Sequence, residues 1–175
     1  LVELMYCDFM GRAGDEIFNQ MAKWQSMSGG LLKMPVVLRV SVGSKYGAQH
    51  SQDWSSMCSH IPGLKVVAPY TAADAKGLLK AAIRDPNPVI FLENEILYGQ
   101  SFPVPQSDDF TVPIGKAKIE RPGKDVTIVA FSLMVGNAMK AAEALAAEGI
   151  DAEVINLRSL RPLDTETIVN SVKKT

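Results

Sequence analysis

The chain has 175 residues, with 18 lysines and arginines against 19 aspartates and glutamates, so its formal net charge is −1. Because 47% of the residues are hydrophobic, the chain can form the cores of one or two globular domains. Its nearly neutral charge and the lack of a Lys/Arg-dense stretch predict no nucleic-acid partner. Its apolar runs are far shorter than the ~20 residues needed to cross a bilayer, so we expect no transmembrane span and no membrane partner. Its first residues show no signal-peptide pattern.

The first half of the chain alternates predicted strands and helices. Short apolar runs bounded by turn residues predict strands at residues 2–7, 34–40, 64–68 and 89–92. Helical spacing of apolar residues predicts a helix from residue 13 to the Ser28-Gly29-Gly30 stop, and a second helix over 72–83 that starts at a Thr71/Asp74 capping pattern. Residues 43–52 read as an irregular polar loop.

The second half begins with a proline-rich stretch. Residues 101–124 have little apolar periodicity, which predicts a linker between a domain at 1–100 and another at 125–175. The latter contains two predicted strands, 126–131 and 152–157, a helix at 135–148 and the start of a helix capped by Asp164. The alternation predicts an α/β fold of parallel sheets flanked by helices.

The two cysteines, Cys7 and Cys58, lie far apart in the sequence and form neither a Cys-x-x-Cys nor a Cys/His pattern. This spacing favours reduced, structural thiols over a disulfide framework or a zinc site. A Walker loop and a Gly-x-Gly-x-x-Gly fingerprint are also missing, so the sequence does not predict phosphate binding by this chain alone.

Ligands of open α/β sheets bind beyond the carboxyl ends of the strands, so the loops that follow the first two strands are candidates for a site. His50 lies in the second of these loops and suits proton transfer, or it ties down its own loop. Phe9 and Met5 could form an apolar wall for a planar ring, or pack in the core. Asp8, Asp15 and Glu16 could form a paired-carboxylate set, but Asp15 and Glu16 lie in a first helical turn, where acidic residues complement the helix dipole, and we favour that interpretation.

The exit of the predicted helix at residues 82–87 is a third candidate. Its last carbonyl groups have no helical partners, so they could gather around a hard cation or be satisfied by water.

Several stretches in a fixed order carry a resemblance to a known family. They include Glu3-Leu-Met-Tyr-Cys-Asp-Phe9, Gly47-Ala-Gln-His-Ser-Gln52, Leu92-Glu-Asn-Glu95 and residues 27–30, 62–67, 74–77, 82–85, 113–118 and 158–164. In these stretches the chain resembles the beta subunits of the thiamine-diphosphate-dependent first component of 2-oxo acid dehydrogenase complexes. The resemblance implies a truncated pyrimidine-binding domain of the transketolase type, the linker, and the first half of a transketolase C-terminal domain.

The resemblance also implies roles for individual residues. Phe9 corresponds to the aromatic that packs on the aminopyrimidine of thiamine diphosphate, with Met5 nearby, and His50 to the active-site histidine that assists acyl transfer to a lipoyl group. A potassium site of some members corresponds to the residues Val36, Ala82, Ile83, Asp85 and Asn87. Magnesium and the coenzyme's diphosphate are expected on the alpha subunit.

For the parent enzyme, the resemblance implies oxidative decarboxylation of pyruvate within a heterotetramer of two alpha and two beta subunits that serves a dihydrolipoyl acyltransferase core. The location implied is the cytoplasm of a bacterium or the mitochondrial matrix of a eukaryote. The family's activating glutamate lies upstream of the region matching Leu1, so we expect this segment alone to be inactive. Residues 40–46 look closer to acetoin-type or general 2-oxo acid members, and residues 130–133 lack a histidine of some relatives. The alternatives are an acetoin or branched-chain enzyme, or a non-catalytic module that binds the alpha subunit and the acyltransferase core.

Overall fold

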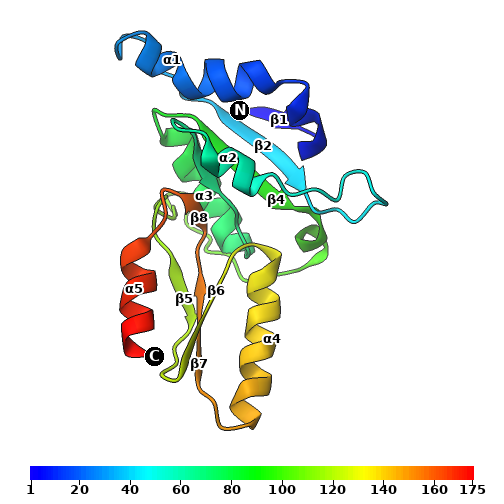
Figure 1. Cartoon of the computed structure of the whole chain (residues 1–175), viewed down its shortest axis with the longest axis vertical. Helices are drawn as coiled ribbons and strands as arrows, with labels where there is room; N and C mark the ends of the chain where they lie inside the picture. The colour runs from blue at the N-terminus through cyan, green and yellow to red at the C-terminus, as the bar shows by residue number, and fades with distance from the viewer.

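The structure, a computed structural model, describes all residues, 1–175, and forms two lobes, each built on its own sheet (Figure 1). The sheet of the first lobe contains β1 (Val2–Leu4), β2 (Val37–Val42), β4 (Val89–Asn94) and β3 (Lys65–Val67) side by side in that order. These four strands are parallel, as the alternation of strands and helices predicts. None of the helices is long and apolar enough to span a bilayer.

One face of this sheet is covered by short helical segments. They are η1 (Cys7–Gly11), η2 (Glu16–Met21), α1 (Ala22–Met27) and α2 (Ser55–His60). Their buried residues, such as Met10 and Cys58, share a core with Val40 and Ile90 of the sheet. The helix expected from residue 13 therefore exists, but its middle turn, η2, is a π-helix, and Gly29 and Gly30 end it in the left-handed region.

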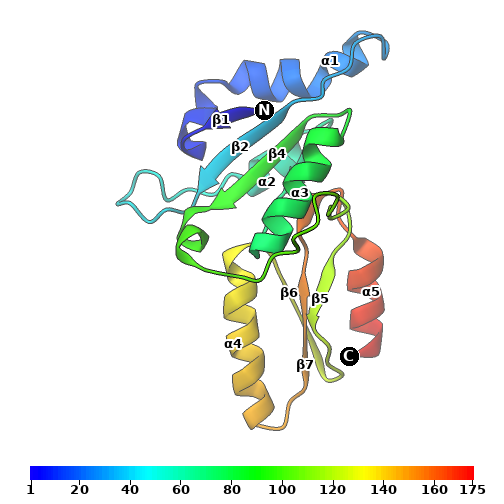
Figure 2. The same ribbon diagram turned by 180° about the vertical axis from the view of Figure 1, so that it is seen from behind.

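The opposite face is covered by α3 (Ala72–Arg84), which lies in front of the sheet in Figure 2. Thr71 and Asp74 form the predicted capping box, in which each side chain accepts from the other residue's backbone N–H. Leu78 and Ala82 of α3 pack against Phe91 of β4. A short 3₁₀ helix, η3 (Glu95–Gly99), follows β4 at the carboxyl edge of the sheet.

The second lobe is a three-stranded sheet between two helices. Its strands are β5 (Lys118–Arg121), β7 (Ala152–Asn156) and β6 (Val126–Ala130) in that order, flanked by α4 (Leu133–Ala147) and α5 (Thr165–Lys174). Asp164 caps α5 as predicted, because its side chain accepts from the Thr167 N–H.

Two strands depart from the sequence-based expectation. β5 lies within the stretch expected to be an irregular linker, and it pairs antiparallel to β7. β8 (Ser159–Arg161) leaves the second lobe and adds an antiparallel edge strand beside β3 of the first sheet. Both are edge strands with few apolar residues, and backbone hydrogen bonds hold them, so they carry no apolar period that a sequence could reveal. The boundaries of the domains themselves stay a prediction.

A buried polar cluster also connects the two lobes. The Asp74 carboxylate accepts from the Arg158 Nε at 2.7 Å and from the Asn156 Nδ2 at 3.0 Å. Asn156 ends β7, and its amide also donates to Glu120 of β5 at 2.9 Å. Because these groups come from α3 on one side and from the second sheet on the other, they fix how the lobes meet.

Candidate functional site

The chain segments that leave β1 and β2 meet at the carboxyl edge of the first sheet. Since β1 and β2 are parallel neighbours, η1 and the loop 43–52 emerge on the same side. The rings of Phe9 and His50 lie with their centroids 5.6 Å apart and their planes inclined by 54°. The structure thus brings together the two residues that the sequence places in separate loops.

The backbone of His50 is held in an unusual conformation. Its φ of 59° lies in the left-handed region, which residues other than glycine seldom adopt. Its N–H donates to Asp8 Oδ1 at 3.1 Å, and its carbonyl oxygen accepts from the backbone N–H of Ser44 at 3.0 Å and also from the Ser44 hydroxyl. Contacts on both sides of the peptide therefore offset the strain and fix the position of the imidazole.

Two further side chains surround the imidazole. The Tyr6 ring stacks on it with centroids 3.8 Å apart and planes 17° apart, and Asp8 Oδ2 lies 3.6 Å from Nδ1. Sequence reasoning did not select Tyr6 and gave Asp8 no role beside His50. The signal that could have found both is that they follow β1 directly, on the edge where the residues after β2 also emerge.

Cys7 connects η1 to the loop 43–52 by a hydrogen bond. Its buried thiol donates to the Gln52 carbonyl oxygen at 3.1 Å. Burial, together with the neighbouring charges of Asp8 and Asp53, raises the pKa of this thiol from 9.0 to about 12. The thiol is therefore neutral at physiological pH and acts as a hydrogen-bond donor, and both Cys7 and Cys58 are free, buried cysteines as the spacing indicates.

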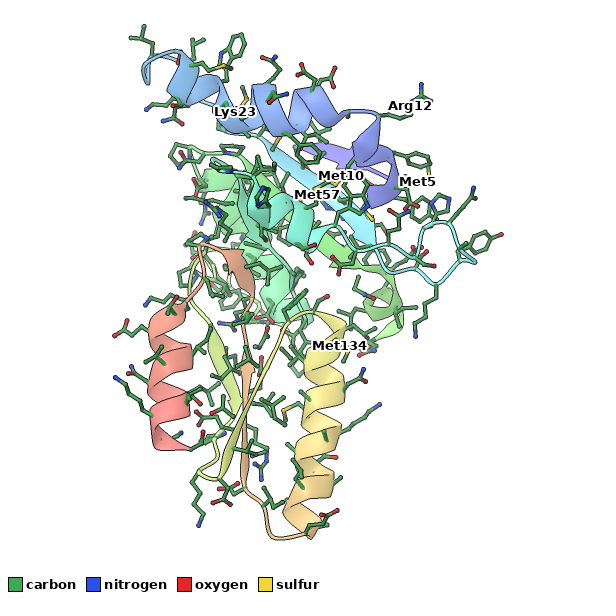
Figure 3. All side chains as sticks on the ribbon, viewed as in Figure 1. Met5, Met10, Arg12, Lys23, Met57 and Met134 are labelled. Atoms are coloured by element: carbon green, nitrogen blue, oxygen red, sulfur yellow. The ribbon has the colours of Figure 1, made fainter.

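The apolar side chains at this edge are open. Phe9 is 42% exposed and Met5, at the carboxyl end of β1 (Figure 3), is 68% exposed. Core packing, the alternative that the sequence left open for this pair, therefore does not account for them. One cavity, of about 380 Å³, is lined by Tyr70, Tyr98 and Phe102 among others, and another, of about 500 Å³, by residues 46–49 of the loop; neither is lined by Phe9 or Met5. The edge at Phe9 and His50 is thus an open surface rather than an enclosed pocket.

The third candidate, the exit of α3, lies at the other end of the sheet. The carbonyl oxygen of Val36 accepts from Val89 N–H at 2.9 Å, which places Val36 beside the segment that follows α3. Asp85 Oδ1 accepts from the backbone and side-chain N–H groups of Asn87, and Oδ2 lies 2.5 Å from Lys65 Nζ. Burial tends to raise the pKa of Asp85, but these partners outweigh it and lower that pKa.

The carbonyl oxygen of Ala82 accepts only from the Asp85 N–H at 3.2 Å. Each carbonyl keeps a second lone pair, while Lys65 already balances the carboxylate charge, so the donor set fits a monovalent cation better than a divalent one. The chain has no group of three or more His, Cys, Asp or Glu side chains placed to hold a metal ion.

The class of the protein follows from the fold together with matches to two known domain families. Residues 1–100 match the transketolase pyrimidine-binding domain family, and residues 115–175 match the transketolase C-terminal domain family. The chain therefore belongs to the transketolase pyrimidine-binding family.

Among individual proteins, the chain is similar to beta subunits of pyruvate dehydrogenase. It is 60% identical, over its whole length, to the pyruvate dehydrogenase E1 component subunit beta of Rhizobium meliloti, of which it covers 38%. It is 59% identical to the mitochondrial subunit beta-1 of Arabidopsis thaliana and covers 50% of that protein. The chain thus spans about half, or less, of the length of the curated relatives it matches.

Solved structures give the same fold. A split-gene transketolase, described as an inactive beta4 tetramer, superposes with a TM-score of 0.79 at 30% identity, over 98% of this chain and 53% of that one. A transketolase mutant of Pichia stipitis superposes with a TM-score of 0.70 at 18% identity, over 93% of this chain and 23% of that one.

Proposed function

We propose that the chain is part of the beta subunit of a pyruvate dehydrogenase, in which the edge formed by η1 and the loop 43–52 is half of a thiamine diphosphate pocket. The observation that carries this proposal is the meeting of Phe9 and His50 at the carboxyl ends of β1 and β2. The identity of 55–60% to pyruvate dehydrogenase beta subunits supports it.

The residues at this edge fit the aminopyrimidine end of the coenzyme. Phe9 is a partly exposed aromatic ring that suits a planar heterocycle, and Met5, exposed at the end of β1, offers a thioether. When bound, thiamine diphosphate supplies the electron sink for decarboxylation of a 2-oxo acid, whereas the protein orients and moves protons. The imidazole of His50 is the side chain among these that can both accept and donate a proton, so we assign proton transfer during acyl transfer to it.

The rest of the pocket comes from another polypeptide in this proposal. The chain contains neither a phosphate loop nor a cluster of metal-binding side chains, so the diphosphate and its magnesium are assigned to an alpha subunit. The parent assembly is a heterotetramer of two alpha and two beta subunits that passes acyl groups to a dihydrolipoyl acyltransferase core. Relatives include mitochondrial proteins and a bacterial one, so its location is the mitochondrial matrix or the bacterial cytoplasm according to the source.

We also assign a potassium ion to the exit of α3. In this assignment the oxygen donors are the carbonyl groups of Val36, Ala82 and Ile83 and the side chains of Asp85 and Asn87. The hydrogen bond from Val89 N–H to the Val36 carbonyl oxygen, which places Val36 beside the segment that follows α3, supports it. Such an ion would stiffen the junction between α3, β2 and β4, and it takes no part in the chemistry.

Association with an alpha subunit tests the proposal. Sedimentation velocity of the chain, mixed with the alpha subunit of a pyruvate dehydrogenase, is expected to show a larger species whose population rises with thiamine diphosphate and Mg²⁺. In a dye-reduction assay with pyruvate as the substrate, the isolated chain is expected to show no activity. Absence of association at all coenzyme concentrations, or turnover by the isolated chain, would contradict this assignment.

A further inference from the structure

The imidazole of His50 lies between the aromatic ring of Tyr6 and the carboxylate of Asp8. The proposed function assigns no role to either residue. Tyr6 covers one ring face in a nearly parallel stack, and Asp8 faces Nδ1. We propose that Tyr6 and Asp8 are positioning residues that hold His50 with the proton on Nδ1 and the lone pair on Nε2. This inference rests on the proposed function only for its relevance to catalysis.

The geometry at Asp8 selects the tautomer. Its Oδ1 accepts from the His50 backbone N–H at 3.1 Å, and this bond holds its Oδ2 3.6 Å from Nδ1. Nδ1 is buried and makes no hydrogen bond within the chain, and Asp8 Oδ2 is the charged oxygen that faces it. A carboxylate can only accept hydrogen bonds, so a proton on Nδ1 is stabilised there, whereas a lone pair on Nδ1 would face the lone pairs of Oδ2.

The other groups around the imidazole do not compete for this proton. The Cys7 thiol, 4.0 Å from Asp8 Oδ2, is neutral and donates to the Gln52 carbonyl oxygen. The Ser44 hydroxyl donates to the His50 carbonyl oxygen, and Phe9 offers only a ring. Of Tyr6, Cys7, Asp8, Ser44 and Phe9, Asp8 is therefore the one that brings a charge to the imidazole.

Tyr6 fixes the plane of the ring. A stacked neighbour at 3.8 Å prevents rotation of the imidazole about χ2, which would exchange the positions of Nδ1 and Cδ2 and turn Nε2 away. The stack needs an aromatic face and does not use the Tyr6 hydroxyl, for which the chain provides no partner. Phenylalanine should therefore replace Tyr6 in this role, and leucine should not.

Nitrogen NMR on the 175-residue chain tests both assignments, because His50 and His60 are its only histidines. His60 is exposed at the end of α2, so a His60→Gln background leaves one imidazole to observe. At alkaline pH, the long-range ¹H–¹⁵N spectrum is expected to show the Nδ1–H tautomer of His50. Its ring protons are expected to be shifted upfield by the Tyr6 ring current.

The variants separate the two roles. Asp8→Ala is expected to move the population to the Nε2–H tautomer, the one that free histidine prefers in water. Tyr6→Leu is expected to abolish the upfield shift, and Tyr6→Phe to retain it. An Nε2–H tautomer in the parent chain, or ring protons without an upfield shift, overturns the inference without any variant. These spectra need no alpha subunit, so they distinguish failure of this inference from failure of the proposed function.

Discussion

At Asp74, a single buried carboxylate both caps α3 and joins the lobes. Its side chain is 1% exposed, and it accepts from Thr71 N–H, Asn156 Nδ2 and Arg158 Nε. The first of these roles is visible in the sequence, since Thr71 and Asp74 have capping-box spacing. The second is not, because Arg158 lies 84 positions along the chain and no local pattern connects it to Asp74.

Replacing Asp74 should therefore destabilise the whole chain. In Asp74→Ala, the Arg158 guanidinium, 16% exposed, loses its buried counter-charge, and Asn156 loses one acceptor. We expect the free energy of unfolding to fall by about 3–5 kcal/mol, measured by urea denaturation. The matched control is Asp109→Ala, whose exposed side chain has no partner in the structure, with an expected change within about 0.5 kcal/mol. Equal values for the two variants would show that the cluster does not hold the lobes together.

The buried carboxylate of Glu153 makes the stability of the chain depend on pH. This fully buried side chain of β7 accepts from Lys174 and Ser171 of α5 and from the Gly123 N–H. Burial tends to raise the pKa of Glu153, but these hydrogen bonds outweigh it and lower the pKa below its ordinary value of 4.5. Because the folded-state pKa is the lower one, the stabilisation is complete above the unfolded pKa and is lost as pH falls through the folded one.

Glu153→Gln is therefore expected to be less stable than the parent chain at about pH 7, and to lose less stability on acidification to about pH 3. Urea denaturation at both pH values measures the difference. Glu143→Gln, on the exposed face of α4, serves as the control and should follow the parent at both. A parallel pH dependence of Glu153→Gln and the parent would contradict the assigned role.

At the scale of elements, α3 covers one face of the first sheet. It also contacts residues 110–112, in the segment that leads to the second lobe. A Cβ atom on Gly77 would lie 2.5 Å from Val112 Cγ2 and 2.8 Å from the Val112 backbone nitrogen. Val112 and Phe110 therefore approach α3 at the one position of the helix that has no side chain. This contact explains a mid-helix glycine that helix propensity alone disfavours.

The substitution Gly77→Ala has two opposing effects on stability. Alanine gains about 1 kcal/mol in helix propensity, and overpacking costs about 1–3 kcal/mol. Since a backbone nitrogen cannot rotate away, we expect a net loss of stability by thermal unfolding. Gly99→Ala, where a new Cβ meets nothing within 4 Å, should not lose stability. A stabilised Gly77→Ala chain would mean that the 110–112 segment does not pack as described.

The potassium assignment is also tested at this scale. With a cation bound at the exit of α3, the midpoint of thermal unfolding is expected to be higher in KCl than in NaCl at equal ionic strength. Asn87→Ala should remove the difference between the salts, because it deletes one of the proposed oxygen donors. Asn137→Ala, on α4 of the other lobe, should retain it. Equal midpoints of the parent chain in both salts would contradict the assignment of a potassium ion to the exit of α3.

The elements that the sequence predicts well are those with continuous apolar runs or helix signals. The strand at 89–92 and the helix at 72–83 lie where the structure has β4 and α3. β5 and β8 were not predictable, because a strand such as Lys118–Arg121 has charged residues at three of its four positions and is held by its neighbour's backbone. For the site, the sequence indicates which loops matter, but the stack of Tyr6 on His50 depends on distances between loops that spacing does not encode.

At the scale of the whole molecule, the chain presents an open edge at the carboxyl ends of its parallel strands, where open α/β sheets bind ligands. Phe9 and Met5 remain partly exposed there although each is apolar. The loop 43–52 projects beyond the sheet on the same side, at the end opposite to α1 (Figures 1 and 2). In the proposed assembly, a second polypeptide closes this edge and completes the pocket.

Titration calorimetry of thiamine diphosphate in the presence of Mg²⁺, into an equimolar mixture of this chain and a pyruvate dehydrogenase alpha subunit, tests that claim most directly. We expect saturable binding that neither chain shows alone, weakened about tenfold by Phe9→Ala, since one stacked aromatic ring contributes about 0.5–1.5 kcal/mol beyond its buried area. Met27→Ala, an exposed apolar residue at the far end of α1, should bind as the parent does. Equal affinity of the Phe9→Ala mixture and the parent, or binding that does not need this chain, would contradict the account.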